Sequence, residues 1–382
     1  MKNEKLLDAM GQIDDQLILE ASEIKKSQKQ WVKWWVAAAC LAVAVLAGVL
    51  LLPAGEAPLE LPQLPMLSIS GNETGAWGYE GYCAYDISEL VSANPWNEKS
   101  KLTVLPVYQN AQTGDVAKME SWAEEITDRL GVSGDRKILW EQGQADKMTG
   151  KMMEPEKKVT LKADGVTVEV DSYMTAEILL EPAVALPEGC NFNLYSPYED
   201  IASVAEFLKQ EYGELMGVTD PQINICGGDY DFYGRQMYQI EFFEGAADET
   251  EQILCYHFNR VAFYCDDDGK LFLIRLHQHD LSGKVADYPI ISLDSAEKRL
   301  IEGNYITTAP CEMPGKRYIR KGELVYRTGK SEAYWMPYYR FFVELPEQEL
   351  SNGLKTYAAY YVPAVHESYI SNMPVWDGSF NG

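Results

Sequence analysis

The sequence predicts an α+β protein in which one transmembrane helix is followed by an extracytoplasmic domain of helix-plus-antiparallel-meander modules. Three observations support this fold class. The chain of 382 residues contains a long uncharged apolar run at residues 34–52. A stretch rich in Pro and Gly comes next, at residues 53–76. Beyond it, helix-start signals recur near residues 115, 197 and 294, and each precedes the alternating polar and apolar residues typical of strands.

The first element that we expect is a cytoplasmic leader helix within residues 1–30. Leu6, Met10, Ile13 and Leu17 recur at spacings of four, three and four residues, which places them on one helical face. A lone helix of this length is marginal in water unless it packs on something. Two alternatives therefore stand: a helix at the membrane interface, and a helix that docks on a cytoplasmic partner through these four residues.

A transmembrane helix is predicted at residues 31–52. The 19 residues of the run at 34–52 carry no charge, and a helix needs about 20 residues to cross a hydrocarbon core about 30 Å thick. Lysines precede the run, and the next base after it is Lys99. The positive-inside rule then places the N-terminus in the cytoplasm and the remainder outside the cell membrane. A cleaved signal peptide fits less well, because 33 residues precede the run.

The distribution of charge separates the leader from the exported part. The net charge is −25, from 33 Lys+Arg and 58 Asp+Glu, whereas residues 1–33 hold six lysines and six acids. The whole deficit therefore belongs to residues 34–382. An acidic domain argues against nucleic acid as a partner, because binding to phosphates needs a basic surface. It also argues against contact with anionic lipid apart from the anchor.

The exported part divides into a linker and two regions. Residues 53–76 predict a semi-rigid spacer, because prolines and glycines are spread along them. A first α+β module is expected at 77–190. A second α+β region is expected at 191–382, with two repeated units at 195–280 and 290–366 as a further alternative.

Three helices are expected in the exported part, and each precedes a run of strands. Asp115 is positioned to cap the first helix, and Gly131 to end it. Ser196-Pro197-Tyr198-Glu199 predicts a capping box for the second, and Asp294 marks the third. Strands are expected in KILWEQ, KKVTLKA, VTVEVDS, QMYQIEFFE, EQILCYHF, RVAFYCD, KLFLIRLHQ, RYIRKGELVYR, AYWMPYYRFFVEL and KTYAAYYVPAV.

Two parts of the chain resemble known families. The order EKLLDAMGQIDDQLILEASE, a lysine patch, WVKWW and AAACLAVAV resembles single-pass membrane proteins of Gram-positive, Clostridia-like bacteria with an anti-sigma-factor-like arrangement. That resemblance implies a sigma factor or a sensor kinase as partner. GKLFLIRL, YPIISLDSAEKRLIEG and GELVYRTG are similar to PepSY-like and YycH/YycI-type regulatory domains. Those families restrain a membrane partner, and their pattern implies no catalytic residue.

The seven cysteines do not form a metal or redox motif. Cys40 lies in the apolar run, and the other six are scattered without CxxC spacing. We expect most of them to be reduced core residues, since free cysteine is commonly buried. If a disulfide exists, Cys255 and Cys265 are the first choice, because they are expected to face each other across adjacent strands.

Two clusters invite a metal interpretation. His277 and His279 project from one face of a predicted strand, but a metal site needs further ligands, such as His257 and Asp280. The acidic turn at 266–269 would be a calcium loop only with an acid at the twelfth position, which is His277. Exposed histidines and a hairpin turn are therefore favoured. We expect no metal and no cofactor.

The chemistry of the sequence favours binding over catalysis. It contains no GxSxG elbow, and paired carboxylates of a glycosidase would depend on spatial arrangement. The 24 tyrosines suit either a groove for peptide or glycan or ordinary sheet packing. We therefore predict a non-enzymatic, membrane-anchored extracytoplasmic regulatory or sensory protein. The alternatives are a cell-envelope binding or scaffold module without a signalling role, and an extracellular hydrolase.

Overall fold

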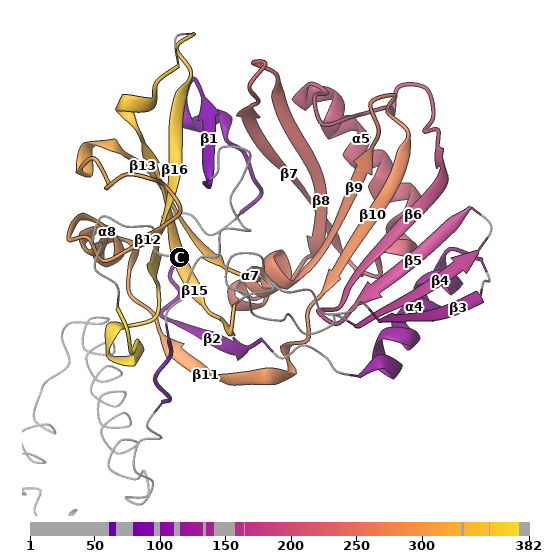
Figure 1. Ribbon diagram of the computed structural model, residues 1–382, viewed down its shortest axis with the longest axis horizontal. Helices are drawn as coiled ribbons and strands as arrows, with labels where there is room; N and C mark the ends of the chain where they lie inside the picture. Colours follow the sequence, from indigo (N-terminus) through magenta and orange to yellow (C-terminus); the bar gives the residue numbers. More distant parts are fainter. Residues whose placement is uncertain are drawn as a thin grey trace, which may run out of the picture. The chain divides into compact units, whose positions relative to one another are not determined.

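Three antiparallel sheets make up the fold (Figure 1). The structure is a computed structural model, and the residues that it describes are 61–65, 79–94, 100–110, 115–132, 135–140, 157–163, 165–329, 332–350 and 352–373.

The largest sheet has eight strands and draws on both regions that the sequence separates at residue 190. Strand β6 pairs with β10, so four strands from before that residue continue into four strands from after it. The hairpins predicted around Gly165 and Gly269 are both confirmed. In spatial order the strands are β3 (Asp135–Trp140), β4 (Lys157–Ala163), β5 (Val166–Asp171), β6 (Thr175–Val184), β10 (Leu271–Gln278), β9 (Asn259–Cys265), β8 (Gln236–Glu244) and β7 (Pro221–Tyr230).

The other two sheets also join distant segments. In the five-stranded sheet, the earliest strand, β1, pairs with the latest, β16. In the three-stranded sheet, β2 lies between β11 and β14. The five strands are β1 (Gly81–Ala84), β16 (Lys355–Pro363), β15 (Pro337–Glu344), β13 (Ile319–Tyr326) and β12 (Ile306–Thr307), and the three are β11 (Lys284–Pro289), β2 (Val104–Gln109) and β14 (Tyr334–Trp335).

Helices α4 (Val116–Arg129) and α5 (Tyr198–Glu211) cover one face of the eight-stranded sheet, together with the short α6 (Gly213–Met216). Asp115 caps α4 as predicted, because its carboxylate accepts hydrogen bonds from two backbone N–H groups of the first turn. The capping box predicted for α5 is wrong. Pro197 occupies the N-cap, and the Ser196 hydroxyl instead accepts a hydrogen bond from the Asn193 N–H.

Helix α7 (Glu249–Phe258) replaces a predicted strand, EQILCYHF. Asp248 caps it through the N–H groups of Thr250 and Glu251, and this start signal outweighs the alternation that suggested a strand. Its apolar side packs into the core of the five-stranded sheet, so the helix lies between the two large sheets (Figure 1).

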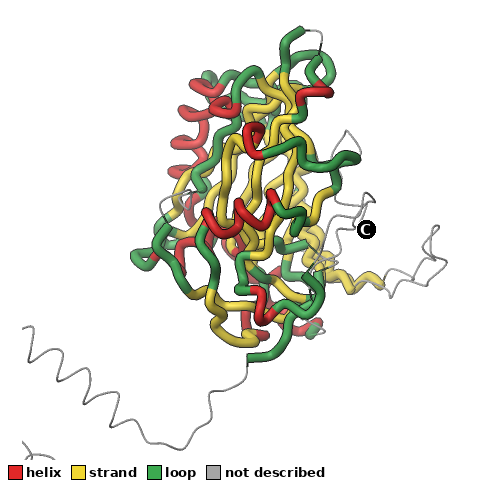
Figure 2. The backbone as a smooth tube through the Cα atoms, turned by 90° about the vertical axis from the view of Figure 1, so that its left-hand side faces the viewer, coloured by secondary structure: helices red, strands yellow, loops and turns green. Residues whose placement is uncertain are grey.

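Helix α8 (Leu293–Ile301) lies on the five-stranded sheet, as the view from that side shows (Figure 2). Its buried residues Ala296 and Leu300 join the same core as Tyr360 of β16. Short 3-10 helices complete the described elements: η2 (Ile87–Glu89), η3 (Leu281–Gly283), η4 (Lys316–Tyr318), η5 (Pro346–Gln348) and η6 (Glu367–Tyr369).

The predicted fold class is wrong. The described part of the chain is mostly antiparallel sheet, and its strands cross between the expected helix-plus-meander modules instead of forming separate meanders. In the same described residues, no helix is long and apolar enough to cross a membrane. The run at 34–52 lies outside the described residues.

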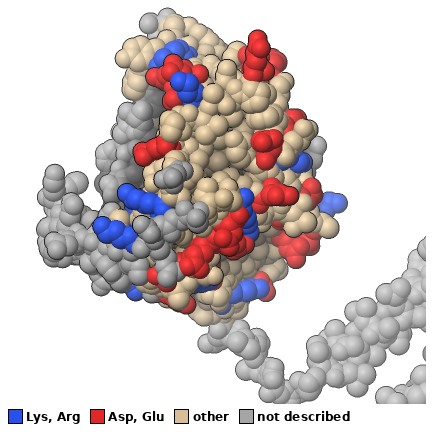
Figure 3. All heavy atoms as spheres, turned by 90° about the vertical axis from the view of Figure 1, so that its right-hand side faces the viewer, with Lys and Arg blue, Asp and Glu red and all other residues tan. Residues whose placement is uncertain are grey.

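The surface carries the acidic character expected from composition. Acidic side chains gather on the side of the molecule that lies to the right in Figure 1, with basic side chains scattered among them (Figure 3). Like charges spread over a face disfavour binding to polyanions.

Residues 61–65, which we assigned to the linker, belong to the folded unit. The Leu64 side chain is fully buried in a cluster with Val107, Tyr288 and Ile370. Its N–H donates to the carbonyl of Tyr369 at 2.8 Å, and its carbonyl accepts from the N–H of Ser371 at 2.8 Å. The segment is therefore a packed strap across the C-terminal end of the fold.

Replacement of Leu64 with Ala tests this packing. Removal of a fully buried Leu side chain should lower the free energy of unfolding by about 2 to 5 kcal/mol, because a cavity remains. The matched control, Leu194→Ala, alters an exposed leucine and should change it by no more than about 0.5 kcal/mol. Urea unfolding measures both values. An equally small change for Leu64→Ala would mean that the strap is not part of the core.

Candidate functional site

A cavity of about 500 Å³ lies between the eight-stranded and the five-stranded sheets. Its lining comes from β7, β8 and β9 on one side, and from β1, β13, β15 and β16 on the other, with α7 contributing Tyr256 and His257. Pockets that bind small molecules typically measure about 300 to 1,000 Å³. The cavity therefore has the size of a ligand site.

Strand periodicity explains why the cavity is polar. Along β8, Ile240 and Phe242 point into the core under the helices, whereas Gln239 and Glu241 line the cavity. Neighbouring side chains on a strand project to opposite faces. The inner face of this sheet thus carries polar groups while its outer face is apolar.

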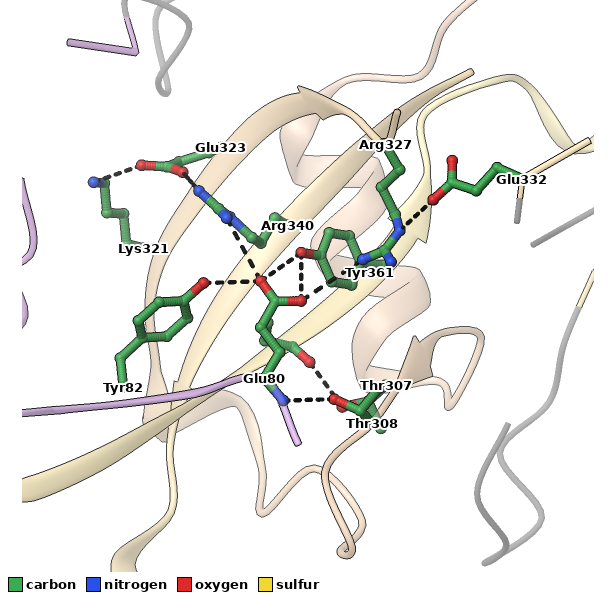
Figure 4. Close-up of polar contacts among 11 residues, drawn as sticks. Glu80, Tyr82, Thr307, Thr308, Lys321, Glu323, Arg327, Glu332, Arg340 and Tyr361 are labelled. Carbon is green, nitrogen blue, oxygen red and sulfur yellow. Dashed lines mark hydrogen bonds and ion pairs between the residues drawn. The ribbon is translucent and has the colours of Figure 1, made fainter. Parts of the chain in front are cut away.

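A buried ion network forms the wall on the five-stranded sheet (Figure 4). Glu323 of β13 is only 2% exposed, and its carboxylate contacts Arg340 Nη2 at 2.7 Å and Lys321 Nζ at 2.6 Å. Burial opposes ionisation of Glu323, but the charges of Arg340 and Lys321 outweigh it and lower the pKa of the carboxyl group. Glu323 therefore remains a carboxylate at neutral pH.

Glu80 extends this network to the strands on the other side of β15. Its carboxylate accepts hydrogen bonds from the hydroxyls of Tyr82 at 2.9 Å and Tyr361 at 2.7 Å, and it lies 3.6 Å from Arg340 Nη1 (Figure 4). Arg327 also lies 3.6 Å from Glu80. The network therefore ties β1, β13, β15 and β16 together around one face of the cavity.

A second polar group lies on the eight-stranded sheet. The Asn224 amide donates to Glu241 at 2.9 Å and accepts from the N–H of Ala93 at 2.8 Å. Arg260 approaches the other oxygen of Glu241, but only to 3.5 Å. The Arg260 Nε is buried and has no hydrogen-bond partner among the described residues. Arg260 is thus the cavity cation with the loosest pairing in that part of the chain.

Three cavity residues that resemble catalytic groups, His257, Cys226 and Tyr256, are held in their neutral forms. Burial lowers the pKa of His257 to about 3, and its Nδ1–H donates to the Ile253 carbonyl at 2.8 Å, which leaves Nε2 without a proton. Burial raises the pKa of the Cys226 thiol and of the Tyr256 phenol well above neutrality. A neutral thiol is a poor nucleophile, and a histidine with so low a pKa is a weak base at pH 7.

The cavity reaches the surface near a group of exposed aromatic residues. Leu194 lines the cavity and is exposed, and Tyr238, which also lines it, packs edge-on against exposed Tyr198. The nearby turn between β7 and β8 carries Phe232, 63% exposed, and Tyr233, 84% exposed. Exposed aromatic side chains of this kind are common in interaction surfaces.

His277 and His279, which we expected to be exposed, are half-buried, and no group of three metal-binding side chains occurs among the described residues. The rings of His277 and His279 stack 5.8 Å apart. His277 contacts the Thr175 hydroxyl at 3.2 Å, and His279 contacts the Phe258 carbonyl at 3.1 Å. Both rings are thus engaged in local packing.

The acidic turn is a hairpin turn, as favoured. The Asp266 carboxylate accepts hydrogen bonds from the N–H groups of Asp268 and Lys270, which closes the turn. Asp280 likewise caps η3 and pairs with Lys118 at 2.6 Å. These acids therefore have structural partners of their own.

Cys255 and Cys265 are both free thiols. Cys255 lies on helix α7 and Cys265 at the end of β9, so they do not face each other across adjacent strands. The predicted docking face, formed by Leu6, Met10, Ile13 and Leu17, lies outside the described residues.

Sequence reasoning missed the cavity itself. One signal was present: Arg340 lies within the apolar stretch of β15 and Glu323 directly precedes the apolar end of β13, and a buried charge requires a partner. Their pairing could not be read from the sequence, because β13 and β15 are joined by a connection that gives no register. Strand β7, which contributes Asn224 and Cys226, was not predicted at all.

Comparison with known proteins adds no family. No protein-family model matches the chain, and no curated protein matches it significantly. The function must therefore be inferred from the geometry of the cavity.

The buried network predicts a large effect for Arg340→Met. Glu323 would lose its guanidinium partner while remaining buried, and we expect the free energy of unfolding to fall by about 3 to 5 kcal/mol. The control is Arg275→Met, because Arg275 also lies 2.7 Å from a glutamate, Glu177, but that pair is about one-third exposed. It should cost at most about 1 kcal/mol. Similar losses for both variants would contradict the role of burial.

The buried neutral His257 should make the stability of the fold sensitive to acid. Because its folded pKa, about 3, is lower than the value of 6.5 for a free histidine, the unfolded state binds more protons between these values. The contribution of His257 to the free energy of unfolding is therefore fully present above pH 6.5 and declines as the pH falls below that value. Between pH 7 and pH 5, the wild type should lose about 2 kcal/mol more than His257→Gln. Parallel pH profiles from urea unfolding would refute a buried neutral His257.

Proposed function

We propose that this protein acts by binding a small ligand in the cavity between its two large sheets, in a regulatory or sensory role and not as an enzyme. The single observation that carries the proposal is a ligand-sized cavity with polar groups from both sheets and aromatic walls. A site of mixed apolar walls and a few fixed polar groups is the usual form of a ligand pocket.

The protonation of the cavity groups supports binding over catalysis. A catalytic site needs an acid, base or nucleophile with a pKa near the working pH. Burial shifts the pKa values of His257, Cys226 and Tyr256 away from that range. They suit hydrogen bonding to a ligand, because each stays neutral and keeps its donor or acceptor.

The position of the cavity suits regulation. A ligand that contacts both sheets would favour one arrangement of β7–β9 relative to β13–β16 over another, and a difference in affinity between two arrangements is what shifts an equilibrium. The partner that would respond remains a prediction: a sigma factor or a sensor kinase contacted by the leader helix.

Filling the cavity tests the proposal. Met237 lines the cavity, and Met237→Trp should occupy the space that a ligand needs. The control, Val184→Trp, adds the same ring at an exposed position outside the cavity lining. A diverse fragment library is screened by ligand-observed NMR, and the bound fragments are titrated into each variant.

Fragments that bind the wild type should lose at least tenfold affinity for Met237→Trp and keep it for Val184→Trp. Thermal unfolding of both variants checks that they are folded. Fragment affinities that are unchanged in Met237→Trp, or the absence of any bound fragment in the wild type, would refute the cavity as the binding site.

A further inference from the structure

Two charged groups in the cavity lack a close partner of opposite charge among the described residues, and they suggest the class of ligand. This inference rests on the proposed binding function. The other cavity cations, Lys321, Arg327 and Arg340, each lie 2.6 to 3.0 Å from a glutamate oxygen. Arg260 and the carboxylate of Asp229 do not have such contacts in the described part of the chain.

The Arg260 guanidinium has N–H donors that no acceptor among the described residues uses. A guanidinium carries five N–H donors, and strong contacts to carboxylates are about 2.7 to 2.9 Å long. The contact of Arg260 with Glu241 is 3.5 Å, and its side chain keeps 31% exposure, which is consistent with its place in the cavity wall. The other oxygen of Glu241 is already held by Asn224. The free edge of the guanidinium therefore suits a second carboxylate.

The carboxylate of Asp229, on β7, lacks a cationic partner among the described residues. It lines the cavity, and no Lys or Arg of the described residues lies within ion-pair distance of its carboxylate. Burial raises the pKa of this carboxyl group, so its ionised form is poorly solvated there. A positively charged ligand group placed beside it would favour the carboxylate.

The strand register gives the spacing along β7 between the backbone positions beside which the two groups lie. Asn224 pairs opposite Glu241, where the Arg260 guanidinium lies, and Asp229 is five residues further along β7. The register shift between Gly227 and Tyr230 uses one extra residue on β7. Four strand steps at about 3.3 Å give a separation of roughly 13 Å. Three extended residues span at most about 10 to 11 Å, and a contact of about 2.8 Å at each end makes up the rest of the distance.

The charge balance distinguishes a zwitterion from a simple anion. Acidic and basic side chains both line the cavity, and an anion bound to Arg260 alone would leave the carboxylate of Asp229 without a partner of opposite charge among the described residues. A ligand with both charges adds no net charge and gives each of the two groups a partner. Tyr82, Tyr238 and Phe342 also line the cavity and suit an aromatic or apolar side chain of the ligand.

We propose that the cavity binds a short peptide with free ends, about three residues long, with its C-terminal carboxylate on Arg260 and its N-terminal ammonium group on Asp229.

The test uses a mixture of tripeptides X-Tyr-X in three forms: with free ends, N-acetylated, and C-amidated. Equilibrium dialysis against the full chain, read by mass spectrometry, gives the affinity for each form. The wild type should bind the free form at least tenfold more tightly than either blocked form, because each block removes one charge.

Two variants separate the ends of the ligand. Arg260→Gln should bind the free and the C-amidated forms equally while still rejecting the N-acetylated form. Asp229→Asn should bind the free and the N-acetylated forms equally while still rejecting the C-amidated form. Arg275→Gln, outside the cavity lining, should keep both preferences. A variant that merely failed to fold would lose all binding, and could not lose one preference and keep the other.

The outcomes separate this inference from the proposed function. Equal binding of free and blocked peptides, or no retention of free peptides by the wild type, overturns the peptide assignment. If fragments still bind and Met237→Trp still excludes them, the cavity remains a binding site for another class of ligand. If neither peptides nor fragments bind, both proposals fail.

Discussion

The buried carboxylate of Glu323 imposes the constraint on which the cavity wall of the five-stranded sheet depends. A charge that is 2% exposed is tolerated only when partners offset the loss of water, and Arg340 and Lys321 supply them. Arg340 also approaches Glu80, whose carboxylate holds the hydroxyls of Tyr82 and Tyr361. Glu323 and Glu80 together therefore hold side chains from four strands, and the wall that these side chains form is polar.

A polar wall facing another polar wall cannot collapse into a dry core. The inner face of the eight-stranded sheet presents Asn224, Glu241 and Arg260, so closing the space would bury the partly exposed guanidinium of Arg260, which is only loosely paired with Glu241. The apolar residues of this sheet pack instead on the other face, under α4 and α5. A cavity remains where the two polar faces meet. The alternation along β7 and β8 thus leaves polar side chains facing the cavity, which is the proposed ligand site.

Several local signals in the sequence were read correctly, although the capping box at Ser196 was not, and the long-range pairing of strands was not predicted. Asp115 and Gly131 bounded α4 correctly, and the Gly165 and Gly269 turns fixed two hairpins, because each depends on neighbouring residues alone. The segment EQILCYHF was mistaken for a strand because its short apolar pattern fits the period of a helix as well as that of a strand. Asp248, however, marked the start of a helix.

The cavity depends on pairings that local patterns do not carry. Strand β6 joins β10 about 90 residues later, and β1 joins β16 about 275 residues later, so the sheets cut across the modules that the helix spacing suggested. Charged residues such as Arg340 were visible within apolar strands, but their partners become evident only with the register of β13 and β15.

Hydrogen exchange measured by mass spectrometry, with and without saturating X-Tyr-X tripeptides with free ends, tests the role of the cavity most directly. We expect ligand-dependent protection to be confined to the segments that line the cavity: β7, β8, the end of α7 with the start of β9, β13 and β15. Helices α4 and α5 on the outer face should exchange as before. Protection on the outer face, or no change at the cavity despite bound peptide, would contradict the claim that the space between the sheets is the binding site.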